Sequence, residues 1–259
     1  MHEKVIAIRR KRPEEIEVMS RAGTILADCL DHVAAHVRPG VTTADLNIVA
    51  DTFIREHGCT PSFLGYQGFP ASICISVNDE AVHGIPGPRV IAEGDLVSLD
   101  CGVILDGWQS DSGLSLVCGT ADAESTLLIE ATSSALDAGI GAAQPGNHIG
   151  DIGAAISATI RRFGFQLLLH HGGHGIGRQM HEPPHVPNDG TPGWGNEIRP
   201  GLVLAIEPIV NAGTGRYRID ADGWTVRTED GRRSCYFEHT VAVTEEGPQV
   251  LTLRRQPAP

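Results

Sequence analysis

The sequence predicts an α+β fold made of two similar halves, in each of which two helices precede a set of strands. Helical periodicity begins at residue 13 and near residue 43 in the first half, and covers 122–142 and 148–163 in the second. Short apolar runs bounded by Gly and Pro indicate strands between and after these segments. An internal repeat relates the two halves.

Each helix start carries a recognisable signal. Pro13 is typical of the first helical position, and Glu14 and Glu15 place negative charge where the helix dipole favours it. Residues 38–40 (Arg-Pro-Gly) end this helix. Thr42 or Thr43 caps a second helix, which stops near Gly58.

A hairpin is predicted over residues 95–117. Its strands are 95–104 and 108–117, joined by the two-residue turn Asp106-Gly107. Residues 71–77 are typical of a further strand. The final third is expected to be mostly strand, over 202–210, 216–227, 234–243 and 249–253.

The repeat has a nearly constant spacing. Residues 37–58 resemble 142–164, and all six identical pairs, such as Gly40 and Gly146, are separated by 106 positions. Residues 93–100 resemble 200–207 at a separation of 107, which places Asp100 and Glu207 at matching strand ends. We therefore expect an N-terminal arm (1–12) and one domain (13–259), whose halves (about 13–120 and 121–253) pack face to face.

The bulk composition excludes several classes of protein. A net charge of −12 repels phosphate and disfavours nucleic acid as the main ligand. The basic run 9–12 is interpreted as a solvated arm, and contact with ribosomal RNA is the alternative. No apolar stretch is long enough for a membrane span, and the first residues lack a signal segment. Six cysteines without a CxxC spacing indicate reduced thiols in a cytoplasmic protein.

The predicted hairpin brings two acids together. With a two-residue turn, Asp111 faces Gly102, and Gly102 shares its side of the sheet with Asp100. The two carboxylates are then diagonal neighbours, with Cα atoms roughly 7–8 Å apart. Such a pair suits two metal ions, for which Gly102 is expected to leave room. The alternative is that both acids lie on a wet face of the hairpin.

Histidines gather in the stretch 170–177 (HHGGHGIG), where His174 is a candidate metal ligand and His170 and His171 are interpreted as structural. Residues 181–185 (HEPPH) match the HExxH pattern of zinc peptidases. That pattern requires a helix, which two consecutive prolines disfavour. His181 is therefore a candidate for substrate contact, and His185 for a loop.

Two further acids, Glu207 and Glu238, lie in apolar strands with no basic residue in the strand. Each taken alone could be a salt-bridged core residue. A cation shared with Asp100 and Asp111 explains all four. His239 points away from Glu238 and is not expected to be a ligand.

These segments resemble the type I, bacterial form of methionine aminopeptidase, in the M24 "pita-bread" metallopeptidase family. The resemblance covers about residues 6–253 and is carried by 63–86 (FLGYQGFPASICISVNDEAVHGIP), 94–113 (GDLVSLDCGVILDGWQSDSG), 172–184 (GGHGIGRQMHEPP), 200–213 (PGLVLAIEPIVNAG), 222–230 (DGWTVRTED) and 236–247 (YFEHTVAVTEEG). It implies two pseudo-symmetric halves with a curved antiparallel sheet flanked by helices, around a dimetal cleft.

The resemblance also implies a role for each site residue. Asp100 would chelate one metal, Asp111 and Glu238 would bridge both, and His174 would bind the second metal with Glu207. Glu207 would also accept a proton and pass it to the leaving amine. His181 would stabilise the oxyanion, and His83 would contact the scissile region at the cleft mouth.

A methionine pocket is implied at six positions, all apolar, aromatic or sulfur-bearing: Phe63, Tyr66, Phe69, Cys74, Met180 and Trp224. Phe63 stands where the family often has a cysteine, and Met180 where it has an aromatic residue. Ser112 replaces a threonine that usually follows the second aspartate. None of these changes removes a metal ligand.

The expected activity is removal of the initiator methionine from nascent polypeptides with a small second residue, by a cytoplasmic monomer with two divalent ions. One imidazole and four carboxylates suit Mn, Fe or Co, and Zn also fits. The rivals are an Xaa-Pro aminopeptidase or prolidase and a non-catalytic pita-bread binding protein. Prolidases add an N-terminal domain, whereas about a dozen residues precede the first predicted helix in this sequence. Type II methionine enzymes insert helices between the last two glutamates, and Glu207 and Glu238 are expected to be too close in sequence for such an insertion.

Overall fold

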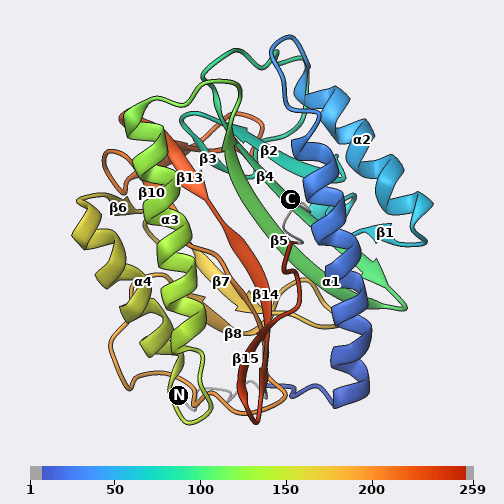
Figure 1. Cartoon of the computed structure of the whole chain (residues 1–259), viewed down its shortest axis with the longest axis vertical. Helices are drawn as coiled ribbons and strands as arrows, with labels where there is room; N and C mark the ends of the chain where they lie inside the picture. The colour runs from blue at the N-terminus through green and yellow to red at the C-terminus, as the bar shows by residue number, and fades with distance from the viewer. Residues whose placement is uncertain (1–7, 255–259) are drawn as a thin grey trace, which may run out of the picture.

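A computed structural model describes residues 8–254 (Figure 1). The first seven residues of the predicted arm and the last five of the predicted domain lie outside this range. Four helices form where helical periodicity was predicted: α1 (Pro13–Ala34), α2 (Thr43–Glu56), α3 (Ala123–Ala142) and α4 (Ile149–Phe163). A single 3₁₀ turn, η1, covers Tyr66–Gly68.

The strands form one large antiparallel sheet and two small ones. The nine-stranded sheet has the order β1-β4-β5-β14-β9-β7-β8, with β2 beside β4 and β15 beside β14. Its members are β1 (Thr60–Pro61), β2 (Ile73–Val77), β4 (Leu96–Leu105), β5 (Trp108–Val117), β7 (Gly172–Gly175), β8 (Glu182–Pro187), β9 (Val203–Ile206), β14 (Glu238–Thr244) and β15 (Gly247–Val250).

The small sheets have the orders β13-β10-β6 and β11-β12-β3. Their strands are β3 (Glu80–Val82), β6 (Gln166–Leu167), β10 (Ile209–Asn211), β11 (Tyr217–Ile219), β12 (Val226–Thr228) and β13 (Ser234–Tyr236). In Figure 1, α1 and α2 lie on one side of the molecule and α3 and α4 on the other, with the strands between and behind them. Within residues 8–254, no helix has the length and apolar character that crossing a bilayer requires.

The repeated sequence has the same local structure in both halves. The backbone N–H of Thr42 donates to Asp45 before α2, and that of His148 donates to Asp151 before α4. Each of these residues also forms an isolated β-bridge, Thr42 with Val90 and His148 with Glu197. The predicted halves and domain boundaries themselves stay predictions.

Three long strands predicted from the sequence are each broken in two. Residues 202–210 form β9 and β10, which are separated by Glu207 and Pro208 because proline has no N–H to donate to a ladder. Residues 216–227 form β11 and β12 with a turn between them, and 234–243 form β13 and β14. The strand expected over 249–253 ends at Val250. Beyond it, the Leu251 side chain packs in the cluster that contains Met19.

The main core lies between the helices and one face of the large sheet. It contains fully buried side chains from α1, such as Leu26 and Leu30, and from β4, such as Leu96 and Leu99. Side chains alternate between the two faces of a strand. The acids of these strands, such as Asp100 on β4, therefore lie on the face of the sheet that the helices do not cover.

The basic run is exposed, as the sequence suggested, at every position except Lys11. Lys11 is buried, its backbone N–H donates to the carbonyl of Gly201, and its ammonium group contacts Glu182 at 2.9 Å. Arg9 and Arg12 remain exposed and pair with Glu15. The run therefore presents less positive charge than its sequence implies, and ribosome contact stays a prediction.

Replacing Lys11 with Met is expected to destabilise the protein by about 3 kcal/mol, because it leaves the Glu182 carboxylate largely buried without its partner. Urea unfolding measures the loss. The double variant K11M/E182Q should recover much of it, and R12M, which removes an exposed charge, should change stability by less than about 1 kcal/mol. Equal stability of K11M and the unmodified protein would refute a structural role for the pair.

Candidate metal centre

The β4–β5 hairpin has the register predicted from its turn. Gly102 faces Asp111, Asp100 faces Gly113, and the turn joins Leu105 to Trp108. Asp100 and Asp111 are therefore diagonal neighbours on one face of the sheet.

Strand β14 brings the third acid next to this pair. Glu238 faces Gly113, so Gly113 on β5 lies between Asp100 and Glu238 in one row of the sheet. Hydroxyl groups fasten β5 to β14 here. Ser112 donates to the carbonyl of Glu238 at 2.8 Å, and Thr240 accepts from the N–H of Asp111 and donates to its carbonyl.

Strands β9 and β7 supply Glu207 and His174. His174 faces Ala205 of β9, and Glu207 follows the end of that strand. The glycines around His174 allow this close packing, because a Cβ at Gly173 would overlap the backbone of Ala205. His174 Nδ1 lies 2.9 Å from the carbonyl of Gly175. A proton donated there leaves the Nε2 lone pair free to face the acids.

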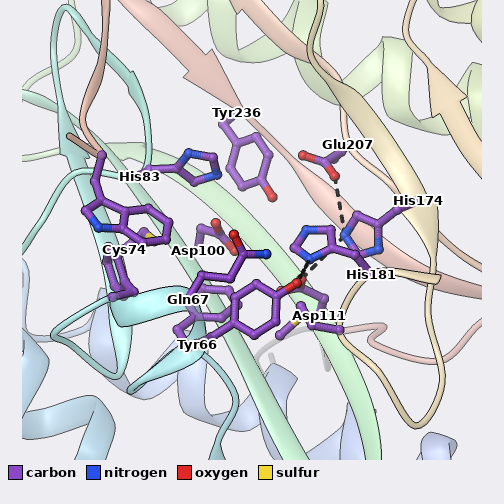
Figure 2. A pocket seen from close by; sticks show the side chains of 14 residues that line it. Tyr66, Gln67, Cys74, His83, Asp100, Asp111, His174, His181, Glu207 and Tyr236 are labelled. Atoms are coloured by element: carbon purple, nitrogen blue, oxygen red, sulfur yellow. Dashed lines mark hydrogen bonds and ion pairs between the residues drawn. The ribbon is translucent and has the colours of Figure 1, made fainter. Parts of the chain in front are cut away.

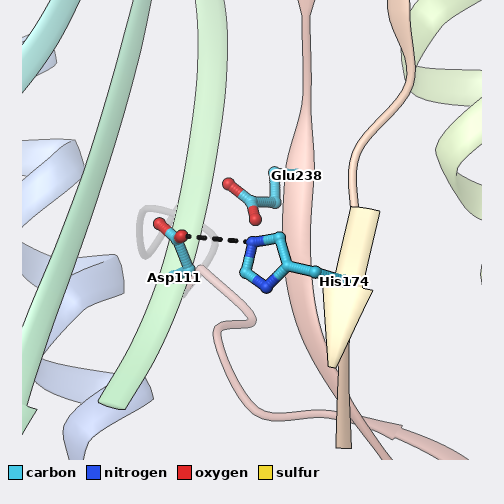
Figure 3. A group of neighbouring side chains, drawn as sticks. All are labelled: Asp111, His174 and Glu238. Carbon is cyan, nitrogen blue, oxygen red and sulfur yellow. Dashed lines mark ion pairs between the residues drawn. The ribbon is translucent and has the colours of Figure 1, made fainter. Parts of the chain in front are cut away.

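The side chains converge on one point. Ligand atoms of Asp111, His174 and Glu238 all lie within 4.8 Å of one another (Figure 3). His174 Nε2 is 3.9 Å from an Asp111 oxygen and 3.7 Å from a Glu207 oxygen. Asp100 lines the same cavity as these groups.

The four acids of this cluster are buried close together, and this shifts their pKa values. Burial first, and then repulsion between the acids, raises the pKa values of Asp100, Glu207 and Glu238 well above their usual range. Burial raises the pKa of Asp111 to about 7. Burial also lowers the pKa of His174 to about 3, so this imidazole is neutral and able to bind a cation.

The donor set fits divalent metal ions. One buried oxygen on each of Asp100, Asp111 and Glu238 has no hydrogen-bond partner. Within residues 8–254, no Lys or Arg forms an ion pair with the four acids, whose only such contacts are with His174. Buried, unpaired carboxylates are costly unless a cation neutralises them, and oxygen and imidazole donors suit Mn, Fe, Co or Zn.

The metal-free protein is expected to lose stability as the pH rises from about 7 to 8.5, because the buried acids have raised pKa values. A carboxyl group whose pKa is higher in the folded than in the unfolded state stabilises the fold below the unfolded value. That stability is lost as the pH rises through the folded value, which is about 7 for Asp111. Histidines with a lowered folded pKa act in the opposite direction, but unfolded histidines, with a pKa near 6.5, are only about a quarter protonated at pH 7 and almost wholly neutral at pH 8.5, so their effect is the smaller one.

Urea unfolding in the presence of a chelator measures this dependence. With saturating MnCl₂ the slope should shrink, because the ions replace the protons that the carboxyl groups would otherwise bind. A metal-free protein whose stability stays constant or increases over this window would contradict the assignment of the buried acids.

A cavity of about 210 Å³ opens beside the acids (Figure 2). Every predicted site residue except Glu238 lines it, and Glu238 is buried next to it. The wall away from the acids is apolar, with Phe69 packed edge-on against Phe63 and Trp224. The complete lining is Phe63, Tyr66, Gln67, Phe69, Cys74, His83, Asp100, Asp111, His174, Met180, His181, Glu207, Trp224 and Tyr236.

Two histidines flank the acids from opposite sides. His181 is exposed, its ring lies 4.2 Å from that of His174, and its Nδ1 is 2.7 Å from the hydroxyl of Tyr66. If Tyr66 donates this bond, the Nε2 of a neutral His181 carries the proton and is a donor. Burial lowers the pKa of His83 to about 4, so that ring is neutral as well.

The other histidines lie elsewhere. His170, His171 and His185 line a different cavity, and the Nδ1 of His239 contacts the hydroxyl of Thr252. Residues 182–187 form strand β8 rather than a helix, which rules out the HExxH zinc site that the sequence left open.

Two residues that line the cavity, Gln67 and Tyr236, are not among those predicted from the sequence. Gln67 lies between predicted pocket residues, and Tyr236 is two positions before Glu238, so spacing offered a signal for both. Gly102, which was predicted to leave room for metal ions, packs against the pocket wall. A Cβ there would meet the Met180 and Phe63 side chains at 2.9 and 3.0 Å, so the glycine makes space for the pocket wall.

Comparison with known proteins agrees with this geometry. Residues 17–245 match the metallopeptidase family M24. The chain belongs to this family. It is 47% identical to methionine aminopeptidase 1 of Mycobacterium tuberculosis, over 92% of each chain. It is 46% identical to methionine aminopeptidase of Clostridium perfringens, over 94% of this chain and 98% of the relative.

Solved structures give the same grouping. A methionine aminopeptidase from Rickettsia prowazekii has a TM-score of 0.94 at 38% identity and covers 95% of this chain and all of its own. Prolidase from Pyrococcus furiosus matches with a TM-score of 0.78 at 23% identity, over 95% of this chain and 66% of its own, and shows the shared fold alone. The predicted α+β pita-bread fold is confirmed, and the chain groups with methionine aminopeptidases among the M24 enzymes.

Proposed function

We propose that this protein hydrolyses the bond after the N-terminal methionine of peptides and nascent proteins, with preference for a small second residue. The observation that carries the proposal is the apolar cavity directly beside the cluster of four acids and His174. The closely similar methionine aminopeptidases support the choice of substrate.

In the proposed centre, Asp100 would hold one divalent ion, Asp111 and Glu238 would be shared between two, and His174 and Glu207 would hold the second. The unpartnered oxygens of Asp100, Asp111 and Glu238 support these assignments. When bound, such ions polarise the scissile carbonyl and lower the pKa of water.

The protein groups have separate tasks in the proposed reaction. Glu207 accepts a proton from the attacking water and delivers it to the leaving amine, and its position on the cavity wall beside His174 supports this role. His181 is placed to donate from Nε2 to the carbonyl oxygen as negative charge develops there. His83 is neutral and lies beside Trp224, and it contacts the backbone of the substrate peptide from the other side of the cavity.

The cavity wall supports methionine as the first residue. Phe63, Phe69, Cys74, Met180 and Trp224 surround a space suited to a flexible thioether side chain. Tyr66, Gln67 and His181 lie at its more exposed end, where a bulky second residue would meet them. We infer the preference for a small second residue from this crowding.

The test is release of free methionine from a Met-Ala-Ser peptide by purified protein with added MnCl₂. We expect cleavage of Met-Ala-Ser, much slower cleavage of a Met-Leu-Ser peptide, and little activity on an Ala-Pro dipeptide. Faster cleavage of Ala-Pro than of Met-Ala would favour the Xaa-Pro alternative. No cleavage of any peptide, with no metal bound, would revive a non-catalytic role.

A further inference from the structure

The phenol of Tyr236 lies beside the acids of the candidate metal centre and donates a hydrogen bond to Glu238 Oε2. Tyr236 is buried, lines the cavity and ends strand β13, two residues before the acid that it contacts. In Figure 2 its hydroxyl points between Asp100 and Glu207. Neither the ligand set nor the methionine pocket proposed above includes it.

Contacts on two sides hold the tyrosine in place. Its backbone N–H donates to the Ser115 hydroxyl at 3.0 Å, and the same hydroxyl donates to its carbonyl at 2.9 Å. The ring packs in a small buried cluster with residues such as Ile209 and Val226. The hydroxyl therefore approaches Glu238 from a fixed direction.

Gly113 makes this position available. It lies in the sheet row between Asp100 and Glu238, and a Cβ there would overlap the Tyr236 ring. The absence of a side chain at Gly113 thus creates the slot in which the phenol reaches the acids.

The hydrogen bond leaves Glu238 able to bridge two ions. Each carboxylate oxygen has two lone pairs. Oε2 therefore accepts the hydrogen bond from the phenol with one lone pair and keeps the second for a metal ion. Oε1 has no hydrogen-bond partner. A donor fixed on one side limits rotation of the carboxylate and turns the remaining lone pairs toward Asp111 and His174, with which Glu238 clusters.

We propose that Tyr236 is a positioning residue that holds the Glu238 carboxylate in its metal-bridging orientation, in a slot that Gly113 provides. This inference rests on the proposed metal centre and adds a requirement to it. The phenol acts on metal affinity through Glu238 and does not itself contact the substrate's reacting atoms.

The test is calorimetric titration of chelator-treated protein with MnCl₂, for the unmodified chain and for Tyr236→Phe. Loss of the hydroxyl should raise the Kd for Mn²⁺ about 10- to 100-fold, the range typical of groups that orient a metal ligand. Turnover of a Met-Ala-Ser peptide by Y236F should be low at limiting Mn²⁺ and recover at saturating Mn²⁺. Tyr217 is a partly buried tyrosine that packs against the same hydrophobic cluster as the Tyr236 ring. Tyr217→Phe removes its hydroxyl and should bind Mn²⁺ with unchanged affinity.

Gly113→Ala provides a second route, because it keeps the phenol but displaces the ring. It should weaken Mn²⁺ binding in the same way, and it should add little to Y236F in the double variant, since both act on one contact. An unchanged Kd in Y236F, or a turnover defect that persists at saturating Mn²⁺, would overturn the positioning role. Failure of the unmodified chain to bind Mn²⁺ would instead overturn the metal centre itself, and the role of Tyr236 with it.

Discussion

Asp111→Asn is expected to abolish detectable Mn²⁺ binding at both positions of the centre and to reduce turnover of Met-Ala-Ser by more than about 100-fold. Changes to groups that only orient a metal ligand cost about 10- to 100-fold, and loss of a bridging ligand should cost more. The amide keeps the shape of the side chain but removes the negative charge that both ions share. Asp111 is buried on β5, between β4 and β14, so the asparagine side chain should stay in the same position.

Asp106→Asn is the matched control for this variant. Asp106 lies in the turn of the same hairpin, exposed and at a positive φ that asparagine also tolerates. Its substitution should leave binding and turnover unchanged. Mn²⁺ binding to D111N with the stoichiometry and affinity of the unmodified chain would show that Asp111 does not bridge.

Glu207→Gln is expected to lower kcat by about 100- to 10,000-fold, the usual contribution of a general acid–base group. Glutamine keeps an oxygen ligand in the same place but has no basic carboxylate to accept a proton. Assays at saturating MnCl₂ separate this effect from weaker metal binding, and KM for the peptide should change much less than kcat.

Glu197→Gln, at an exposed acid paired with Arg199, serves as the comparison and should have normal kinetics. The pH profile adds a second readout, because E207Q should lose the dependence that arises from titration of Glu207. A kcat within tenfold of the unmodified value, at saturating metal, would assign the proton transfer to another group.

Much of the fold followed from local sequence signals. Helix starts were predicted well because caps act locally, as at Thr42 before α2. The β4–β5 register followed from a two-residue turn, which determines the pairing of every residue beyond it. Strand ends in the last third were predicted less well. Pro208 breaks one strand locally, but the sequence does not show that the two parts then join different sheets, β9 beside β14 and β10 beside β13.

The candidate site shows the same division. The four acids could be predicted as metal ligands because a charged residue in an apolar strand needs a partner, and the strands contain no basic residue. The surroundings of Lys11 and Gly102 were not predicted because both depend on partners far away in sequence, Glu182 and Met180. Tyr236 was overlooked because a tyrosine in a buried strand is ordinarily a packing residue, and only the three-dimensional structure reveals the contact with Glu238.

The central claim is that Asp100, Asp111, His174, Glu207 and Glu238 together hold divalent metal ions. Anomalous X-ray diffraction from crystals soaked in MnCl₂, recorded on both sides of the manganese absorption edge, tests it most directly. We expect two peaks about 3.5–4 Å apart, with Asp111 and Glu238 between them. A map without manganese peaks among these five side chains, at concentrations that saturate binding in solution, would contradict the assignment.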